Sequence, residues 1–274
     1  MVNGQIVNEI ITSVQNPRIK QMLTLQQKSS ERRKLGLFVV EGQRELQHCI
    51  DAGLQIDTIF YCPSFLPIEG EIPKGQRRSF PVSPYVYSKI AYRGSTEGII
   101  ATVKTPNRTL SSLPLKGAGG SIFVVLERVE KPGNLGAILR SADAAGVSAV
   151  IVCDPLTDLY NPNLIRSSIG AIFTVPTVAC TSEECIAWLK QNHIQILTAQ
   201  LQDSSLYYDT DMRRPTAIVM GTESTGLTPI WREAADAHIR IPMLGRLDSL
   251  NVSVSAAILM YEAVRQRGGE IVDR

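Results

Sequence analysis

The sequence predicts an α/β protein in two parts: a C-terminal α/β domain on a mostly parallel sheet and a smaller N-terminal α/β domain. In the second half, short apolar runs alternate with helical segments, which is typical of a parallel sheet covered on both faces. Between the halves, Thr105 to Gly120 holds two prolines and three glycines and has no hydrophobic periodicity. We therefore expect domains at residues 1–105 and 121–274, joined by a linker at 106–120.

The N-terminal part predicts a small set of helices and strands. Residues 17–28 read as a helix because Ile19, Met22, Leu23 and Leu25 recur at helical spacing. Residues 41–53 read as a second helix, with Leu46, Cys49 and Ile50 on one face. Short apolar runs predict strands at 38–40, 57–62 and 98–103.

The C-terminal part alternates more regularly. Its apolar runs predict strands, its amphipathic stretches predict helices, and right-handed crossovers should join the parallel strands. The expected strands are 121–126, 147–153, 173–175, 195–199, 217–220 and a short piece at 238–243. The expected helices are 134–145, 161–168, 183–192 and one that starts near Asn251.

Composition limits the class of protein. The chain has 274 residues, 44% of them hydrophobic and 20% charged, which suits a folded globular protein. No apolar run reaches the roughly 18 residues of a membrane helix, and the N-terminus does not read as a signal peptide. The five cysteines form no CxxC pair, so we expect a reducing, cytoplasmic setting. The three histidines lie far apart, and we expect no membrane partner and no metal site.

Charge is unevenly distributed along the chain. Residues 1–116 hold 15 Lys and Arg against 9 Asp and Glu, whereas residues 117–274 hold 13 against 17. This asymmetry suggests that the first part faces a nucleic acid. The alternative is that clusters such as Arg32-Arg33-Lys34 are simply solvated surface.

The first candidate site is the stretch from Glu127 to Gly146. Pro132-Gly133-Asn134 begins a helix that follows a strand, and Asn134 and Arg140 lie six residues apart in its first two turns. In open α/β sheets, ligands bind at this carboxyl edge. A GxGxxG pattern is missing here, which disfavours a dinucleotide-dependent oxidoreductase. The alternative is an ordinary β–α turn with a surface arginine.

Two further candidates lie near the C-terminus. The loop Gly221-Thr222-Glu223-Ser224-Thr225-Gly226 has glycines that allow a ligand to approach the backbone closely, although a plain turn has the same composition. Residues 249–255 begin the last helix, and the packing of a capped helix would also explain them.

Taken together and in this order, NLGAILRSADAAG, VMGTESTGL and IPM…SLNVSVSAAI resemble the three motifs of the SpoU/TrmH branch of the SPOUT methyltransferases. These enzymes use S-adenosylmethionine to methylate the ribose 2′-hydroxyl of RNA. The segments NPRIK, LFVVEGQRELQ and STEGIIATV resemble the RNA substrate-binding domain that many members carry.

The resemblance implies a C-terminal segment threaded into a deep trefoil knot, a homodimer and an RNA partner. Ribosomal RNA is the expected target, with transfer RNA as the alternative substrate. The chain could also be a resistance-type methyltransferase or a catalytically inactive RNA-binding relative. The resemblance also implies a set of site residues. The expected donor-binding residues are Thr198, Ala199, Gln200, Met220, Gly221, Ile241, Leu250 and Ser253, and the expected catalytic residues are Arg140, Asn134, Glu223 and Asn251.

The family commonly has glycine where this chain has Ser224, which could narrow the loop. The family is often described with the arginine activating the 2′-hydroxyl, but a guanidinium has a pKa above about 12 and is a poor base. Arg140 either fixes the adjoining phosphate and hydroxyl or relays the proton through a phosphate oxygen, and the sequence leaves both roles open.

Overall fold

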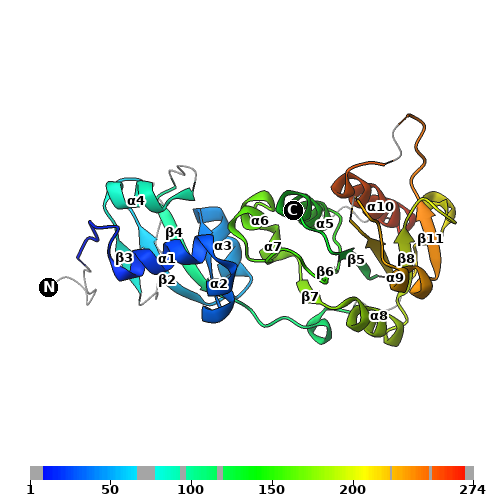
Figure 1. Cartoon of the computed structure of the whole chain (residues 1–274), viewed down its shortest axis with the longest axis horizontal. Helices are drawn as coiled ribbons and strands as arrows, with labels where there is room; N and C mark the ends of the chain where they lie inside the picture. The colour runs from blue at the N-terminus through cyan, green and yellow to red at the C-terminus, as the bar shows by residue number, and fades with distance from the viewer. Residues whose placement is uncertain are drawn as a thin grey trace. The chain divides into compact units, whose positions relative to one another are not determined.

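The computed structural model describes residues 9–66, 78–92, 97–115, 120–222, 224–246 and 249–268. The chain divides into two compact units (Figure 1). One comprises Met1–Pro106 with Tyr160–Ile165, and the other Asn107–Leu159 with Arg166–Arg274. Part of the expected linker, residues 116–119, lies outside the described residues, and the domain boundaries stay a prediction.

The first unit is built on a four-stranded sheet in the order β1-β4-β2-β3. The pairs β1–β4 and β4–β2 are antiparallel, and β2–β3 is parallel. Apolar side chains of the sheet, α1 and α4 form its core, including Ile19, Phe60 and Val86. The elements are α1 (Pro17–Gln27), α2 (Ser29–Leu35), β1 (Leu37–Glu41), α3 (Gln43–Asp51), β2 (Ile56–Tyr61), β3 (Ser79–Pro81), α4 (Pro84–Ile90) and β4 (Ile99–Lys104).

The expected helices and strands of this unit are present, but the helix expected at 41–53 begins two residues later. Glu41 is still in β1, where it pairs with Ile100 of β4. Gly42 then turns the chain with a φ of 106°, a conformation that favours glycine, and α3 follows it. The sequence did not predict α2, β3 or α4, which are too short to show a clear period.

The second unit is built on a seven-stranded sheet in the order β7-β6-β5-β10-β8-β11-β9, and every strand pair in it is parallel. The strands are β5 (Ile122–Glu127), β6 (Ala149–Cys153), β7 (Thr177–Cys180), β8 (Gln195–Ala199), β9 (Ser205–Leu206), β10 (Thr216–Met220) and β11 (Ala237–Arg240). The helices are α5 (Pro132–Ala144), α7 (Ala171–Thr174), α8 (Ser182–Gln191), α9 (Pro229–Ala234) and α10 (Val252–Gln266), with 3-10 turns at Leu110–Ser112 and Tyr207–Asp209. Helix α6 (Pro162–Ser167) begins in the segment Tyr160–Ile165, which belongs to the first unit, and ends in the second.

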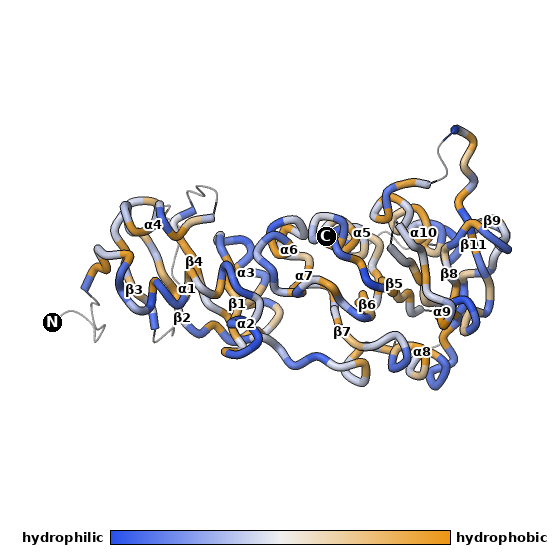
Figure 2. The backbone as a smooth tube through the Cα atoms, in the orientation of Figure 1, coloured by the Kyte–Doolittle hydropathy of each residue, from blue (hydrophilic) through white to orange (hydrophobic). Residues whose placement is uncertain are grey.

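Helices cover both faces of this sheet, as the alternation predicted (Figure 1). On one face α5 and α10 pack together and against the central strands, and on the other lie α8 and α9. The central strands β5, β6 and β10 are buried along their whole length, which explains their continuous apolar sequences. Figure 2 shows these hydrophobic runs between more hydrophilic connections. The trefoil knot stays a prediction, because strand order alone does not define the threading.

The strand expected at 173–175 is wrong. Residues Ala171–Thr174 form the short helix α7, and the strand begins at Thr177. Gly170 enters the helix with a φ of 82°, and Pro176, which has no N–H to donate, separates the helix from β7. A short apolar run has no period long enough to distinguish a buried strand from a buried helical turn.

Among the described residues, no helix has the length and apolar character needed to cross a bilayer.

Two glycines of α5 generate a stability prediction. A Cβ added at Gly136 would lie 2.7 Å from the backbone carbon of Ser167, whereas one added at Gly133 would meet nothing within 4 Å. Gly136→Ala should therefore lower the free energy of unfolding by about 1–3 kcal/mol, because α5 and the segment around Ser167 must separate. The matched control Gly133→Ala should be neutral or stabilising by up to about 1 kcal/mol. Urea denaturation of both variants checks this, and equal stabilities would contradict it.

Candidate functional site

A cleft of about 560 Å³ lies at the carboxyl ends of three neighbouring strands, β10, β8 and β11. Parallel strands end at the same edge, so the loops that follow them lie side by side. Its lining is mixed, with apolar side chains, hydroxyls, two arginines and backbone from the three loops, α9 and the start of α10. The lining residues are Ala199, Gln200, Leu201, Gln202, Met220, Gly221, Thr222, Ser224, Thr225, Gly226, Leu227, Arg232, Ile239, Arg240, Ile241, Met243, Ser249, Leu250, Val252, Ser255 and Leu259.

The loop after β10 folds back on itself at the cleft. The Gly226 amide donates to the Thr222 carbonyl at 3.1 Å, and the two residues form an antiparallel bridge. A Cβ at Gly221 would lie 2.3 Å from the Gly226 backbone, so any larger residue would open the fold-back. Gly226 has a φ of 68°, which also favours glycine. The two glycines thus serve the shape of the loop itself.

A buried carboxylate anchors the end of this loop. Glu127, the last residue of β5, is 2% exposed and accepts hydrogen bonds from the Thr228 amide at 2.8 Å and the Thr228 hydroxyl at 2.6 Å. Thr228 directly follows the cleft-lining Leu227 and is the N-cap of α9.

The same network continues beneath α9. The Ser182 hydroxyl donates to Asp154 at 2.6 Å and accepts from the indole N–H of the buried Trp231 at 3.0 Å. It also lies 3.4 Å from Glu127. The sequence did not predict this network, although an acidic residue that ends a buried apolar run is a recognisable signal.

Thr198 lies beneath the cleft and does not line it. It is fully buried in β8, and its hydroxyl is 2.6 Å from Nδ1 of His238 in β11. Since Ile239, Arg240 and Ile241 follow His238 and line the cleft, this bond fixes the strand from which that loop leaves. The sequence alone indicates no role for His238 beyond its place in a short apolar run.

The first and third motifs meet through an amide pair. Oδ1 of Asn251, the N-cap of α10, accepts from the amide and hydroxyl of Ser253 at 2.9 and 2.6 Å. This orients the Asn251 side chain so that its Nδ2 donates to Oδ1 of Asn134 in α5 at 3.1 Å. Leu250 and Val252, on either side of Asn251, line the cleft, so the pair lies at its border.

The expected site residues therefore fall into distinct groups. Six expected donor-binding residues line the cleft: Ala199, Gln200, Met220, Gly221, Ile241 and Leu250. Thr198 and Ser253 support it from outside. Arg140 is exposed in the third turn of α5, beyond the two turns expected, and among the described residues no hydrogen bond or ion pair holds it. Glu223 lies outside the described residues. The individual roles stay predictions.

Two basic side chains in the cleft lining were not expected. The Arg232 guanidinium lies 3.7 Å from the Asp203 carboxylate, and Arg240 donates to the Ser204 hydroxyl at 3.4 Å. Both partners belong to the segment after β8, so these contacts join two walls of the cleft.

Comparison with known proteins agrees with this arrangement. The model of the SpoU rRNA methylase family matches residues 121–261, which hold all three motifs. The chain belongs to this family. The model of the MRM3-like substrate binding domain matches residues 16–101. The resemblance seen in the sequence is thereby confirmed.

Individual proteins are similar to this chain over nearly its whole length. A 23S rRNA (uridine(2479)-2′-O)-methyltransferase of Streptomyces viridochromogenes is 30% identical over 273 residues, covering 94% of this chain and 92% of the relative. A crystal structure of an RNA 2′-O ribose methyltransferase has a TM-score of 0.80 and 39% identity, covering 94% of this chain and 99% of that one. The AdoMet-bound rRNA methyltransferase from Sinorhizobium meliloti has a TM-score of 0.84 and 30% identity, covering 94% and 97%.

The Glu127 network generates a prediction. The two Thr228 donors each bond to a different oxygen of Glu127. Glu127→Gln replaces one of these acceptors by an NH₂ group that faces a donor, so it should lower the free energy of unfolding by about 1–3 kcal/mol. Hydrogen exchange of residues 222–228 should also accelerate, because the loop loses its anchor. The matched control is Glu130→Gln, since Glu130 is exposed on the same connection. Unchanged exchange in the Glu127 variant would mean that the loop holds its shape without the carboxylate.

Proposed function

We propose that this chain transfers a methyl group from S-adenosylmethionine to the 2′-hydroxyl of a ribose in ribosomal RNA. The observation that carries the proposal is the meeting of the three motifs. The second and third motifs line one cleft, and the Asn251–Asn134 hydrogen bond brings the first motif to its border. The names of the 23S rRNA relatives support ribosomal RNA as the substrate.

The cleft suits S-adenosylmethionine in size and chemistry. Its volume of about 560 Å³ falls in the range of small-molecule sites, about 300–1,000 Å³. Apolar Ile241, Leu250 and Leu259 can hold the adenine faces, and the backbone of the glycine loop offers N–H and C=O groups to its edges. When bound there, the donor supplies a methyl group on a positively charged sulfur.

With the donor bound, the residues of the chain must position the target ribose against it. The anchored loops hold the reaction partners in line, which supplies much of the acceleration in such transfers. Arg140 is exposed and free to take an RNA phosphate beside the target ribose, and Asn134, held by Asn251, can hydrogen-bond the nearby backbone. We assign Arg140 to phosphate and hydroxyl positioning. The methyl transfer proposed here uses no metal ion.

The first unit is proposed to bind the RNA. Its segment of the chain carries the excess of positive charge, and phosphate contacts supply much of RNA affinity. A groove of about 290 Å³ there is lined by Arg18, Gln21, Arg78 and Phe80, among others. The Arg18 guanidinium lies 4.5 Å from the centre of the Phe80 ring, a platform on which an unpaired base can stack.

We further propose a homodimer that acts in the cytoplasm. Val254 and Tyr261 on α10 are 47% and 49% exposed, and Ile258 lies between them on the same helical face. The next residue, Leu259, is fully buried in the core. All five cysteines are free thiols, which supports a reducing compartment.

Replacing the exposed arginine tests the assignment of Arg140. Arg140→Ala should lower methyl transfer about 100- to 1,000-fold, by analogy with the loss of one transition-state donor. Donor affinity measured by calorimetry should stay unchanged, because Arg140 does not line the cleft. Lys190→Ala on the exposed side of α8 is the charge-matched control. Full activity of the Arg140 variant would remove it from the mechanism.

The nature of the acceptor tests the reaction itself. Ribosomal RNA fragments should take up a methyl group from labelled donor, and mass spectrometry should place it on a ribose. A fragment with deoxyribose at the mapped nucleotide should accept none. Methylation of that fragment would mean that a base is the acceptor, and donor binding without any transfer would indicate an inactive relative.

The exposed face of α10 generates the assembly prediction. Light scattering at micromolar protein should give about twice the mass of one chain. Tyr261→Glu should shift the protein toward monomer, because it places a charge in the proposed interface. The control Tyr208→Glu changes a tyrosine that is 46% exposed elsewhere in the same unit. A wild-type monomer would contradict the proposal.

A further inference from the structure

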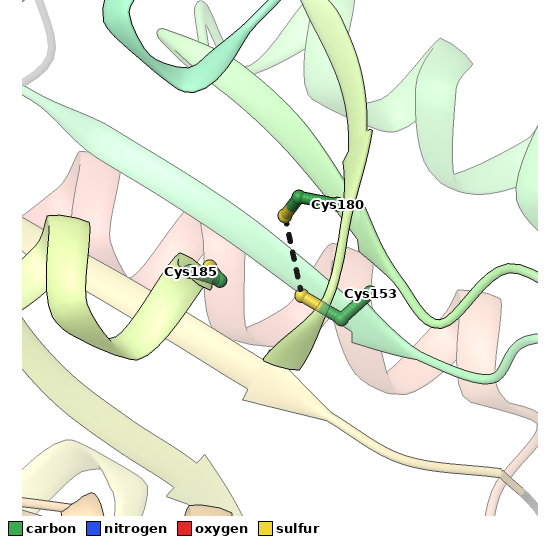
Figure 3. A group of neighbouring side chains, drawn as sticks. All are labelled: Cys153, Cys180 and Cys185. Carbon is green, nitrogen blue, oxygen red and sulfur yellow. Dashed lines mark hydrogen bonds between the residues drawn. The ribbon is translucent and has the colours of Figure 1, made fainter. Parts of the chain in front are cut away.

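Three cysteines that are separate in sequence lie together in the second unit. Cys153 ends β6, Cys180 ends β7 and Cys185 lies in α8. Their three sulfur atoms all lie within 4.8 Å of one another, and Cys153 Sγ is 4.0 Å from Cys180 Sγ. Figure 3 shows the side chains of Cys153 and Cys180 pointing toward each other from neighbouring strand ends, with Cys185 on the adjacent helix. Within the described part of the chain, no other three His, Cys, Asp or Glu side chains come this close.

The spacing of the sulfurs fits a thiolate-bound metal ion. Zinc–sulfur bonds of about 2.3 Å place the sulfurs of a tetrahedral site about 3.8 Å apart. The observed separations need only small side-chain rotations to reach that value. A disulfide would instead require two sulfurs to approach to about 2.05 Å. If the three cysteines served only to fill space in the core, small apolar side chains would do the same. Three sulfur atoms that converge on one point additionally offer a set of soft metal ligands.

The groups around the three cysteines favour a bound cation, and one of the thiols is accessible to solvent. Cys153 and Cys185 are fully buried, whereas Cys180 is half-buried and borders solvent. The carboxylates of Asp154 and Glu184 lie close enough to act electrostatically on Cys180.

We propose that Cys153, Cys180 and Cys185 bind one thiophilic divalent cation of the zinc type as three thiolates, with a solvent oxygen as the fourth ligand. Binding releases three thiol protons, which leaves a complex of net charge −1. The ion would tie the short edge strand β7 to β6 and α8. The cleft lies at β10, β8 and β11, with β5 between these strands and β6, so the site is structural and separate from methyl transfer.

This assignment revises the expectation of no metal site. The sequence spacings of 27 and 5 residues match no common ligand pattern, and only the pairing of β6 with β7, in which Cys153 lies opposite Cys180, brings the thiols together.

Cobalt(II) is the probe for the test. The full chain, freed of metal and kept under a non-thiol reductant, is titrated with Co²⁺ alone and then with Zn²⁺. We expect one Co²⁺ per chain, sulfur-to-cobalt charge-transfer absorption, visible bands of a four-coordinate ion, and their loss when Zn²⁺ displaces cobalt. Zn²⁺ should also raise the Tm of the wild-type chain.

Variants decide whether these three thiols are the ligands. Cys180→Ser changes the half-buried thiol with little effect on packing and should weaken Co²⁺ binding by at least about 100-fold, since even outer-shell partners of metal ligands contribute about 10- to 100-fold. It should also abolish the Tm increase with Zn²⁺. The matched control Cys49→Ala, in the first unit, should bind as wild type does.

Several results would overturn the proposal. They are a wild-type spectrum with no thiolate charge transfer, a site retained in Cys180→Ser, or a site lost in Cys49→Ala. A Cys153–Cys180 disulfide formed on exposure to a hydroperoxide, in a chain that binds no Co²⁺ when reduced, would overturn it as well. Circular dichroism of each variant confirms that a loss of binding is not a loss of fold.

Discussion

The parallel pairing of β10 with both β5 and β8 is the constraint on which the rest of the second unit depends. These pairings bring together strands that lie far apart along the chain. Because all the strands run in one direction, the loops that follow β8, β10 and β11 emerge at one edge and form a single cleft. The buried apolar sequences of the strands and the helices on both faces hold this register in place.

The loops at this edge of the sheet also need a defined shape, and hydrogen bonds of buried side chains provide it. Glu127 holds Thr228, Thr198 holds His238, and in each case the residue held is adjacent to or near a cleft-lining segment. Leaving a buried polar group unpaired costs about 1–3 kcal/mol, so each bond strongly disfavours alternative loop positions. The support for the cleft therefore comes from side chains that do not line it.

The carboxyl ends of the strands hold two separate groups of residues, the cleft proposed for methyl transfer and the three clustered thiols. The cleft belongs to β10, β8 and β11, while the three thiols belong to the β7–β6 edge and α8. The Glu127–Ser182–Asp154 network lies between these regions along the sheet order, since Glu127 ends β5 and Asp154 follows β6. A metal ion at the thiols would stiffen the edge of the sheet without needing to contact the methyl-transfer site.

The sequence alone predicts the α/β class, the mostly parallel sheet and the three motifs, because buried parallel strands and glycine loops have strong local patterns, although it gives no sign of the two-residue strand β9. It could not place short elements: the apolar run at 173–175 proved helical, since so few residues have no resolvable period. Six of the expected donor-binding residues line the cleft, but Thr198 and Ser253 act through hydrogen bonds that only the fold reveals. Pairs such as Asn134 with Asn251, or Cys153 with Cys180, are contacts between distant segments. Side-chain chemistry is read from local sequence, whereas such proximity is set by the register of strands and the packing of helices, which the local sequence pattern does not reveal.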